Sequence, residues 1–174
     1  MSSGMERILR TSPVTGIRME SLLESALVSE LLAPSPELWL VSPWISDVTV
    51  LDNSRGGYDG LLPDASARPY SLAEVLALLV RGGAQLTIIT RHDLHNGPFL
   101  RRLEGLAAGG RLLVVKHDDL HEKTLCGQDW IITGSMNFTI RGMELNDEVV
   151  FYRVDAQAAA QARVDLAHRW RKLA

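Results

Sequence analysis

The sequence has very little cysteine and no long apolar segment, and each absence narrows the class of protein. A single cysteine, Cys126, leaves no partner for an internal disulfide and is typical of a reducing cytoplasm. No apolar run approaches the ~18 residues that cross a membrane. The first residues, Met-Ser-Ser-Gly-Met-Glu-Arg, lack the apolar segment of a secretory signal. We therefore expect a cytoplasmic protein without a membrane span.

The sequence also lacks a strong excess of charge, since its formal net charge is −3 at pH 7. The chain as a whole gives no electrostatic case for nucleic acid, so a site for a polyanion would need a local basic patch. Hydrophobic residues make up 46 % of the 174 residues, which allows a substantial core and argues against general disorder. This length fits one domain, and no linker or internal repeat divides residues 1–174.

Helical and strand patterns alternate along most of the chain. Apolar residues at helical spacing predict helices, and short apolar runs between turn residues predict strands. The expected helices are 19–32, 72–81, 98–108 and 157–173. The expected strands are 38–41, 48–51, 85–90, 111–116, 123–126, 130–133 and 148–153. This alternation predicts an α/β fold, a mixed β-sheet flanked by helices on both faces.

Two segments lack periodicity. Residues 1–17 carry Pro13 and Gly16 and are expected to form a lead-in arm or a short edge strand. Residues 52–69 are rich in Gly, Asp, Ser, Arg and Pro, and a loop of this length is either functional or mobile. Two expectations stay open for this loop, a cover over a cleft and plain disorder.

The polar residues with chemical meaning lie in the stretch LHEKTLCGQDWIITGSMNFTIRGMELNDEVV. Residues two apart in a strand point to the same face, so His121 and Lys123 are expected to project together. An imidazole beside a fixed cation suits phosphate chemistry. Ser135 and Asn137 follow in a glycine-led turn, where a hydroxyl and an amide supply donors close to the backbone. Glu148 could hold the second ring nitrogen of His121 and so fix its tautomer.

This pattern resembles the phospholipase D superfamily, whose signature, the HKD motif, is His-x-Lys, a later aspartate, and then Gly-Ser-x-Asn. The matching text here is His121-Glu122-Lys123 and Gly134-Ser135-Met136-Asn137-Phe138-Thr139. The family also places an acidic residue after this turn, and Glu148 fits that place. The likeness is sharpest over residues 111–151, with a weaker match at Ser42-Pro43-Trp44-Ile45. In detail the signature is most similar to bacterial members in DNA-modification and phage-defence islands, including 7-deazapurine modification clusters.

One departure concerns the aspartate of the motif. The family places it five residues after the lysine, where this chain has Gln128, with Asp129 one step later. The interval from Lys123 to Gly134 is also one residue shorter than usual, which indicates a trimmed hairpin turn. Either Asp129 substitutes for the aspartate of the family, or the supporting role of that aspartate is lost. The other motif residues are in place, so the pattern favours activity.

The resemblance implies a metal-independent phosphodiesterase without a cofactor. In that mechanism one histidine attacks phosphorus and forms a phosphohistidine, while a second protonates the leaving oxygen and then activates water. The lysine and asparagine stabilise charge on the non-bridging oxygens. This chain has one motif and a complete site needs two, so the resemblance implies a homodimer that shares His121, Lys123 and Asn137 across a two-fold axis. Identical subunits make the two histidine roles equivalent until substrate binds.

The expected substrate is nucleic acid, in particular DNA, because short single-motif bacterial members are commonly nucleases. One alternative is hydrolysis or transfer at a phospholipid headgroup, which a hydrophobic rim around the site would favour. A second alternative is a non-enzymatic role as a DNA-binding or scaffold subunit of a defence or modification complex with partner proteins.

Several further residues are candidates for substrate binding. The residues expected to line the substrate site are Gly134, Thr139, Arg141 and Trp44. Trp44 could stack on a base, although partial burial in the core is the commoner role of a tryptophan. A phosphate-binding rim could be formed by Arg91, Arg101, Arg102 and Arg141, or Arg101 and Arg102 could be an ordinary solvated helix face.

The remaining histidines are weaker candidates. His92 and His95 have no further ligands at convincing spacing, so no metal site is expected. His117 lies near the motif. An exposed loop histidine is a simpler interpretation of it than a role in proton transfer.

Overall fold

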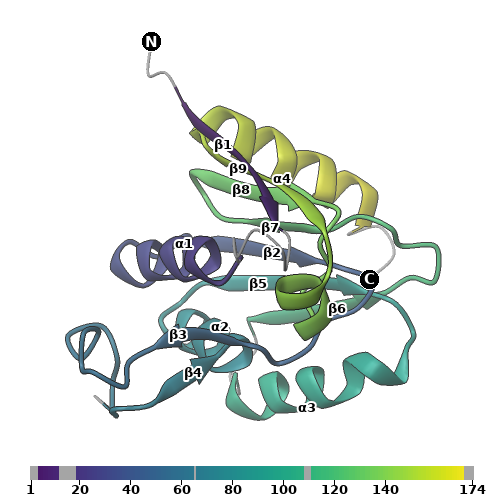
Figure 1. Ribbon diagram of the computed structural model, residues 1–174. Coiled ribbons are helices and arrows are strands. Elements are labelled where there is room, and N and C mark those ends of the chain that lie inside the picture. Colours follow the sequence, from purple (N-terminus) through teal and green to yellow (C-terminus); the bar gives the residue numbers. More distant parts are fainter. Residues whose placement is uncertain (1–3, 12–18, 65, 108–110, 171–174) are drawn as a thin grey trace.

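The computed structural model describes residues 4–11, 19–64, 66–107 and 111–170 (Figure 1). Its helices are α1 (Glu20–Leu32), α2 (Leu72–Arg81), α3 (Gly97–Leu106) and α4 (Ala156–Trp170), with a 3₁₀ turn η1 (Leu94–Asn96) and a π-helical turn η2 (Arg141–Leu145). Its strands are β1 (Met5–Thr11), β2 (Glu37–Val41), β3 (Thr49–Asp52), β4 (Pro69–Ser71), β5 (Gln85–Thr90), β6 (Leu112–Lys116), β7 (Thr124–Cys126), β8 (Trp130–Gly134) and β9 (Glu148–Val154).

Within the described ranges, seven of these strands form one mixed sheet in the order β1-β9-β8-β7-β2-β5-β6, while β3 and β4 pair separately. Strands β2, β5 and β6 run parallel to one another, whereas β7 runs antiparallel to β2. From β7 to β1 every pairing is antiparallel. The predicted mixed sheet is therefore confirmed, and β2 stands where its parallel and antiparallel halves meet.

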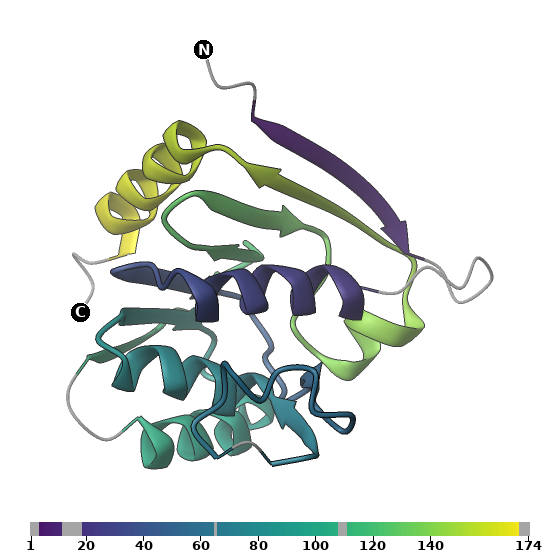
Figure 2. The same ribbon diagram turned by 90° about the vertical axis from the view of Figure 1, so that its left-hand side faces the viewer.

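The side chains of β2 alternate between two hydrophobic cores, as strand geometry requires. Leu38 and Leu40 belong to the larger core, which also takes the apolar faces of α1, α2 and α3. Trp39 and Val41 belong to the second core, which Leu166 and other residues of α4 close from the other side. Helices therefore cover both faces of the sheet, as the sequence pattern predicts (Figures 1 and 2). None of the described helices is long and apolar enough to cross a membrane.

The predicted helices and strands are present, with small shifts at the ends that the structure describes, and the predicted helix ends at residue 108 and at residues 171–173 lie outside the described part of the chain. Strand β7 begins at Thr124. His121 and Lys123 therefore lie in the segment before the strand, whereas the sequence pattern places them on a strand. The sequence pattern does not predict η2. Of the predicted N-terminal segment, β1 forms an edge strand, and residues 12–17 lie outside the described part of the chain. Cys126 is buried in the second core, where desolvation raises the pKa of its thiol to about 11.

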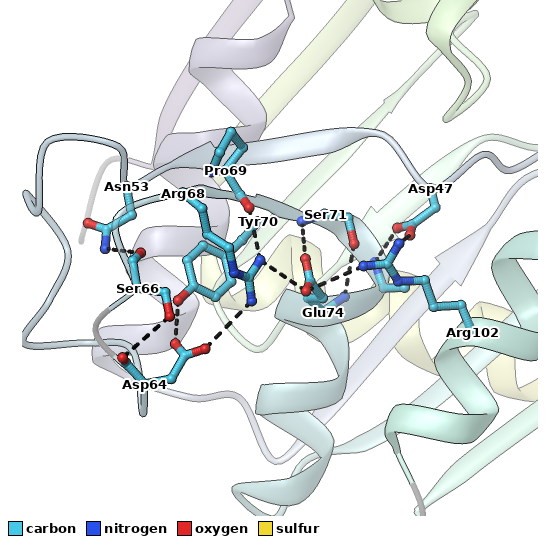
Figure 3. A network of polar contacts seen from close by, with 11 residues as sticks. Asp47, Asn53, Asp64, Ser66, Arg68, Pro69, Tyr70, Ser71, Glu74 and Arg102 are labelled. Atoms are coloured by element: carbon cyan, nitrogen blue, oxygen red, sulfur yellow. Dashed lines mark hydrogen bonds and ion pairs between the residues drawn. The ribbon is translucent and has the colours of Figure 1, made fainter.

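The long loop between β3 and β4 is organised by the buried side chain of Asn53 (Figure 3). Its amide nitrogen donates to Asp59 Oδ1 at 2.8 Å and to the main-chain oxygen of Ser66 at 3.0 Å. Its Oδ1 accepts the N–H of Tyr58 at 2.8 Å. The Tyr58 hydroxyl in turn donates to Glu24 of α1 at 3.2 Å, so the loop is attached to this helix.

A second group of polar contacts closes the base of the loop (Figure 3). The guanidinium of Arg68 lies over the Tyr70 ring, 4.0 Å from its centroid, and pairs with Glu74 of α2 at 3.0 Å. The Tyr70 hydroxyl donates to the carboxylate of Asp64, and this bond is the first cause that holds the pKa of Asp64 below its usual range. Glu74 and Ser71 cap the start of α2 by reciprocal hydrogen bonds.

The tip of this loop lies far from the C-terminal ends of β2 and β5. Residues 60–63 share a groove with Leu31 and Leu79, at the C-terminal ends of α1 and α2. These helices lead into β2 and β5, so their C-terminal ends lie where those strands begin. The described parts of the loop, residues 52–64 and 66–69, therefore lie against α1 and α2 and not over the ends of β2 and β5.

We predict that Asn53→Ala releases this loop before the rest of the protein unfolds. The substitution removes three partly buried hydrogen bonds that join residues 53, 58, 59 and 66, which costs about 2 kcal/mol of local stability. Limited trypsin digestion should then cut faster after the exposed Arg55. Ser54→Ala is the matched control, because the Ser54 side chain is exposed and its hydrogen bond goes to the exposed carboxylate of the nearby Asp52 and not across the loop. Equal cleavage rates in the two variants would contradict the role of Asn53.

Candidate active site

The strand order gathers the polar motif residues at one edge of the sheet. Strands β2, β5 and β6 end at this edge, and the antiparallel β7 begins there, with Val41 opposite Thr124. The hairpin that follows brings the end of β8 and the start of β9 to the same edge, where Gly134 pairs with Val150. We call this the site edge. The residues that flank its strand ends are Trp44, Arg91, His121, Lys123, Ser135, Asn137 and Glu148.

His121 is exposed on the site edge and shares it with two cations. The Nη2 atom of Arg91 lies 3.2 Å from Nδ1 and 3.4 Å from Nε2 of the imidazole. Lys123 donates from Nζ to the main-chain oxygen of His121 at 2.6 Å. An imidazole beside an arginine and a lysine is an arrangement that can receive a phosphate anion.

Ser135 and Glu148 form a pair of their own. The Ser135 hydroxyl donates to Glu148 Oε2 and accepts the N–H of Val149 at 3.0 Å. Asn146 donates from Nδ2 to Glu148 Oε1 at 3.2 Å. Across the described residues, Glu148 makes no hydrogen bond to His121, so the expected Glu148–His121 contact is not formed, and Arg91 contacts the ring instead.

Lys123 links the Arg91–His121 contact electrostatically to the Ser135–Glu148 pair. Burial lowers the pKa of its ammonium group, the Glu148 carboxylate opposes this shift, and the charge of Arg91 adds to it. Glu148 is therefore close enough to act on the charge of Lys123. In this structure Glu148 influences the site through the lysine and through Ser135, and not through the ring of His121.

Gly134 marks the point where β8 leaves the sheet. Its φ is +157°, and a Cβ at this position would collide with the main-chain oxygen of Val149. Glycine is thus required by the close approach of β9.

The turn that follows is tied to the segment after β2, because the Ser46 N–H donates to the Phe138 oxygen at 2.8 Å. Asn137 lies in this turn with its Oδ1 3.5 Å from the hydroxyl of Ser42.

Two of the residues expected to bind substrate, Thr139 and Arg141, lie beside the turn that carries Asn137. Thr139 accepts the N–H of Gly142 on its hydroxyl oxygen at 3.1 Å, which fixes the start of η2. Arg141 is exposed, and its side chain makes no contact with the described motif residues. Both lie next to the turn of the motif, and neither touches His121.

The predicted arginine rim does not form as a group. Arg102 pairs with Asp47 at 3.2 Å and with Glu74 at 3.3 Å (Figure 3), and Arg101 is exposed on α3. Arg91 reaches His121 because it directly follows β5, the strand next to β2. The sequence gives all four arginines equal standing, and only this position after a buried strand could have distinguished Arg91.

The other histidines do not gather into one site. His92 Nδ1 pairs with Asp118 at 2.9 Å, and His95 Nε2 contacts the hydroxyl of Ser46 at 2.9 Å. The His117 ring packs edge-on against a tryptophan of α4, with 5.2 Å between ring centroids. These contacts give each histidine a separate structural neighbour.

The turn between β7 and β8 lies at the opposite end of β7 from the site edge. The N–H of Gln128 donates to Ser35 Oγ at 2.7 Å. Ser35 donates its hydroxyl at 2.6 Å and its N–H at 2.9 Å to the buried carboxylate of Glu30, which also accepts the indole N–H of Trp130 at 2.6 Å. Asp129 is exposed in this turn. The buried acid of the hairpin is therefore Glu30, contributed by α1, and not Asp129.

The sequence matches a family model described as "Cardiolipin synthase, PLD-like domain" over residues 64–170, which is more than half of the chain. The matched range contains the complete His-x-Lys and Gly-Ser-x-Asn segments and the glutamate that follows them. The protein belongs to the phospholipase-D-like family. This membership supports a phosphodiesterase-type activity.

Solved structures share the fold of this family member. A phospholipase D family member, Nuc from Salmonella typhimurium, superposes with a TM-score of 0.67 at 11 % identity, covering 98 % of this chain and 96 % of its own. NucT from Helicobacter pylori gives 0.62 at 13 % identity, covering 93 % and 92 %. TrmBL2, described as an archaeal chromatin protein with a novel mode of DNA binding, gives 0.56 at 15 % identity, covering 96 % and 52 %. No curated protein matches the sequence.

We predict that Glu30→Gln destabilises the protein while Asp129→Ala does not. The Glu30 carboxylate accepts hydrogen bonds from three donors, and in Glu30→Gln the side-chain NH₂ must face at least one of them. This loss should lower the free energy of unfolding by about 2 kcal/mol. Asp129→Ala removes an exposed side chain and should change the free energy of unfolding by less than about 0.5 kcal/mol. Urea unfolding followed by tryptophan fluorescence measures both. The reverse order of effects would return the supporting role to Asp129.

Proposed function

We propose that this single domain is a metal-independent phosphodiesterase that cleaves DNA as a homodimer, with His121 as nucleophile or proton donor. One observation carries the proposal. An exposed imidazole stands with Arg91 and Lys123 at the same sheet edge as Ser135, Asn137 and Glu148. Exposure matters because a second copy of this edge can approach only an open site.

The proposed chemistry uses two copies of His121. A ring nitrogen of one His121 attacks phosphorus, which forms a P–N bond and breaks the P–O bond to the leaving group. The other His121 gives its proton to the leaving oxygen and later takes a proton from water. The oxygen of this water attacks phosphorus and breaks the P–N bond, which restores the first ring. Lys123 and Asn137 would stabilise charge on the non-bridging oxygens, and Ser135 would be held by Glu148.

A two-fold assembly across the site edge is supported by apolar side chains beside it. Leu94, in η1 after β5, is 95 % exposed, Ile140, just before η2, is 53 % exposed, and Leu145, the last residue of η2, is 57 % exposed. A second subunit that docked on this edge would remove these side chains from water. A dimer that covered them would also bring two copies of His121 together.

DNA is the substrate that we propose for this assembly. The proposal is supported by the resemblance of the motif to bacterial members in modification and defence islands, and one structural neighbour is described by its mode of DNA binding. We accordingly propose a cytoplasmic role in DNA modification or phage defence, together with partner proteins. The acidic net charge of the chain is compatible with this role because the cations stand together at the site edge.

A phospholipid headgroup is the second candidate substrate. The observation that favours it is the same set of exposed apolar residues, Leu94, Ile140 and Leu145, which would contact lipid if no second subunit covered them. The description of the matching family model names a lipid-synthesis enzyme. Vesicle binding that is lost in Leu94→Asp without any change of oligomeric state would favour this candidate over DNA.

We predict that the wild-type protein cleaves DNA in EDTA and that His121→Ala does not. The proposed mechanism has a protein nucleophile and needs no metal, so chelation should leave the rate unchanged. Single- and double-stranded DNA are incubated with each protein, and His168→Ala, an exposed histidine on α4, serves as the control. Activity that EDTA abolishes and Mg²⁺ restores would refute the mechanism. DNA binding that survives His121→Ala, without cleavage by wild type, would instead indicate a non-enzymatic subunit.

We further predict that one wild-type His121 per dimer is not enough. Wild type and His121→Ala are unfolded together in equal amounts and refolded, so that subunits exchange at random. Only dimers with two intact motifs should react, which leaves about one quarter of the activity of wild type alone. Independent sites in each subunit would leave about half. That second result would contradict the shared site.

A further inference from the structure

Arg91 is held at the site edge by neutral groups. Its Nε donates to the main-chain oxygen of Leu120 at 2.8 Å, and its Nη2 lies against the ring nitrogens of His121. Its guanidinium stacks on the Trp44 ring, with Cζ 4.9 Å from the centroid. Among the described residues no carboxylate forms an ion pair with Arg91, and its Nη1 has no hydrogen-bond partner. The charge of Arg91 acts on Asp93 only without direct contact, as the last of the causes that lower the pKa of that carboxyl, so the donors of the guanidinium remain available to an anion.

The Trp44 ring that carries Arg91 is itself fixed. Its indole N–H donates to Asp93 Oδ2 at 2.9 Å, while Asp93 Oδ1 accepts the N–H of His95 at 2.8 Å. These two hydrogen bonds, with the His95 amide first, hold the pKa of Asp93 below its usual range. A carboxylate fixed in this way orients the indole, and the indole offers one flat face to the guanidinium.

The backbone beneath these side chains is joined by Asn96, which is 1 % exposed. Its amide nitrogen donates to the main-chain oxygens of Pro43 at 3.0 Å and Arg91 at 3.2 Å, and to the hydroxyl of Thr90 at 2.8 Å. Its Oδ1 accepts the N–H of Ile45 at 2.8 Å. One buried amide therefore fixes the segment that follows β2 relative to the segment that follows β5. The guanidinium of Arg91 is thus positioned by the carbonyl of Leu120 and the ring of Trp44, and its backbone is held by Asn96. A mobile surface arginine would lack such contacts.

We infer that Arg91, positioned by Trp44 and Asn96, is a phosphate-binding residue of this site, where it binds a non-bridging oxygen of a phosphodiester. This inference rests on the proposed function, since the phosphorus must lie beside His121. The guanidinium now lies at the nitrogen-bearing edge of the imidazole, where an attacked phosphorus must come. An arriving phosphate takes donors of Arg91 in a fork of charge-assisted hydrogen bonds and leaves the ring nitrogen free to react.

The inference also changes the role of Trp44. Its face is occupied by the guanidinium of Arg91, so Trp44 acts as a positioning residue for a phosphate ligand and not as a stacking platform for a base. These two roles make opposite predictions for a ligand without a base. If the ring positions Arg91, the loss of Trp44 should lower the affinity for inorganic phosphate. If the ring binds a nucleobase, the affinity for inorganic phosphate should not change.

The test is titration calorimetry of inorganic phosphate into the wild type and six variants, one of which combines Trp44→Ala with Arg91→Ala. Arg91→Ala should weaken phosphate binding about tenfold to hundredfold, and Arg91→Lys should recover only part of the loss because an ammonium lacks the planar fork. Trp44→Ala should weaken binding by a smaller factor, Trp44→Phe should stay near wild type, and Trp44→Ala should add nothing to Arg91→Ala. Arg81→Ala, an exposed arginine at the far end of α2, is the matched control.

Turnover of a phosphodiester gives a second measurement. Arg91→Ala should raise KM more than it lowers kcat, because the contact exists in the bound substrate as well as in the transition state. Free guanidinium ion should restore part of the lost activity, which a merely structural arginine would not allow.

The outcomes separate this inference from the proposed function. Phosphate binding that depends on Arg91 in a protein that cleaves no diester would keep the phosphate site and reject the phosphodiesterase. Cleavage that requires His121 but is unchanged in Arg91→Ala would do the reverse. Absence of phosphate binding by the wild type, or equal binding by Arg91→Ala and Arg81→Ala, overturns the inference. If Arg91→Ala fails to fold, Arg91→Lys and the two Trp44 variants still decide it.

Discussion

The site depends on the pairing of β2 with a parallel strand on one side and an antiparallel strand on the other. A parallel neighbour ends where β2 ends, and an antiparallel neighbour begins there. Residues after β2 and β5 therefore meet residues before β7 at one edge, although up to about eighty positions separate them in the chain. If β7 were parallel to β2, Arg91 and His121 would lie at opposite ends of the sheet. The direction of this one strand brings them into contact.

Much of this fold could be predicted because its signals are local. The helices show their apolar period and the strands their short apolar runs, and the spacing of His121, Lys123, Ser135 and Asn137 indicates the family. The side chains that hold these residues could not be found in this way. Neither the Ser135–Glu148 bond nor the Arg91–His121 contact has a local signal, because each depends on which strand ends become neighbours.

Glu30 shows the same limit at the other end of β7. A reader of the motif looks for a carboxylate near Gln128 and finds only Asp129, which is exposed. The structure supplies the carboxylate from α1, through Ser35, and buries it against Trp130. The polar groups at this hairpin turn thus find their acceptor on a distant segment of the chain, a contact that the spacing of the motif does not predict.

The arginines of this chain also explain how an acidic protein can offer a site to a polyanion. Arg102 lies between Asp47 and Glu74, so its charge is already balanced by carboxylates. Arg91 and Lys123 are held instead by the main-chain oxygens of two consecutive residues before β7. A carbonyl group fixes a cation through its dipole but does not cancel its net charge, so Arg91 keeps its attraction for an anion, while the Glu148 carboxylate offsets part of the charge of Lys123. Net charge counts these cations equally with Arg102, whereas a ligand meets only the charge that the fold leaves unpaired.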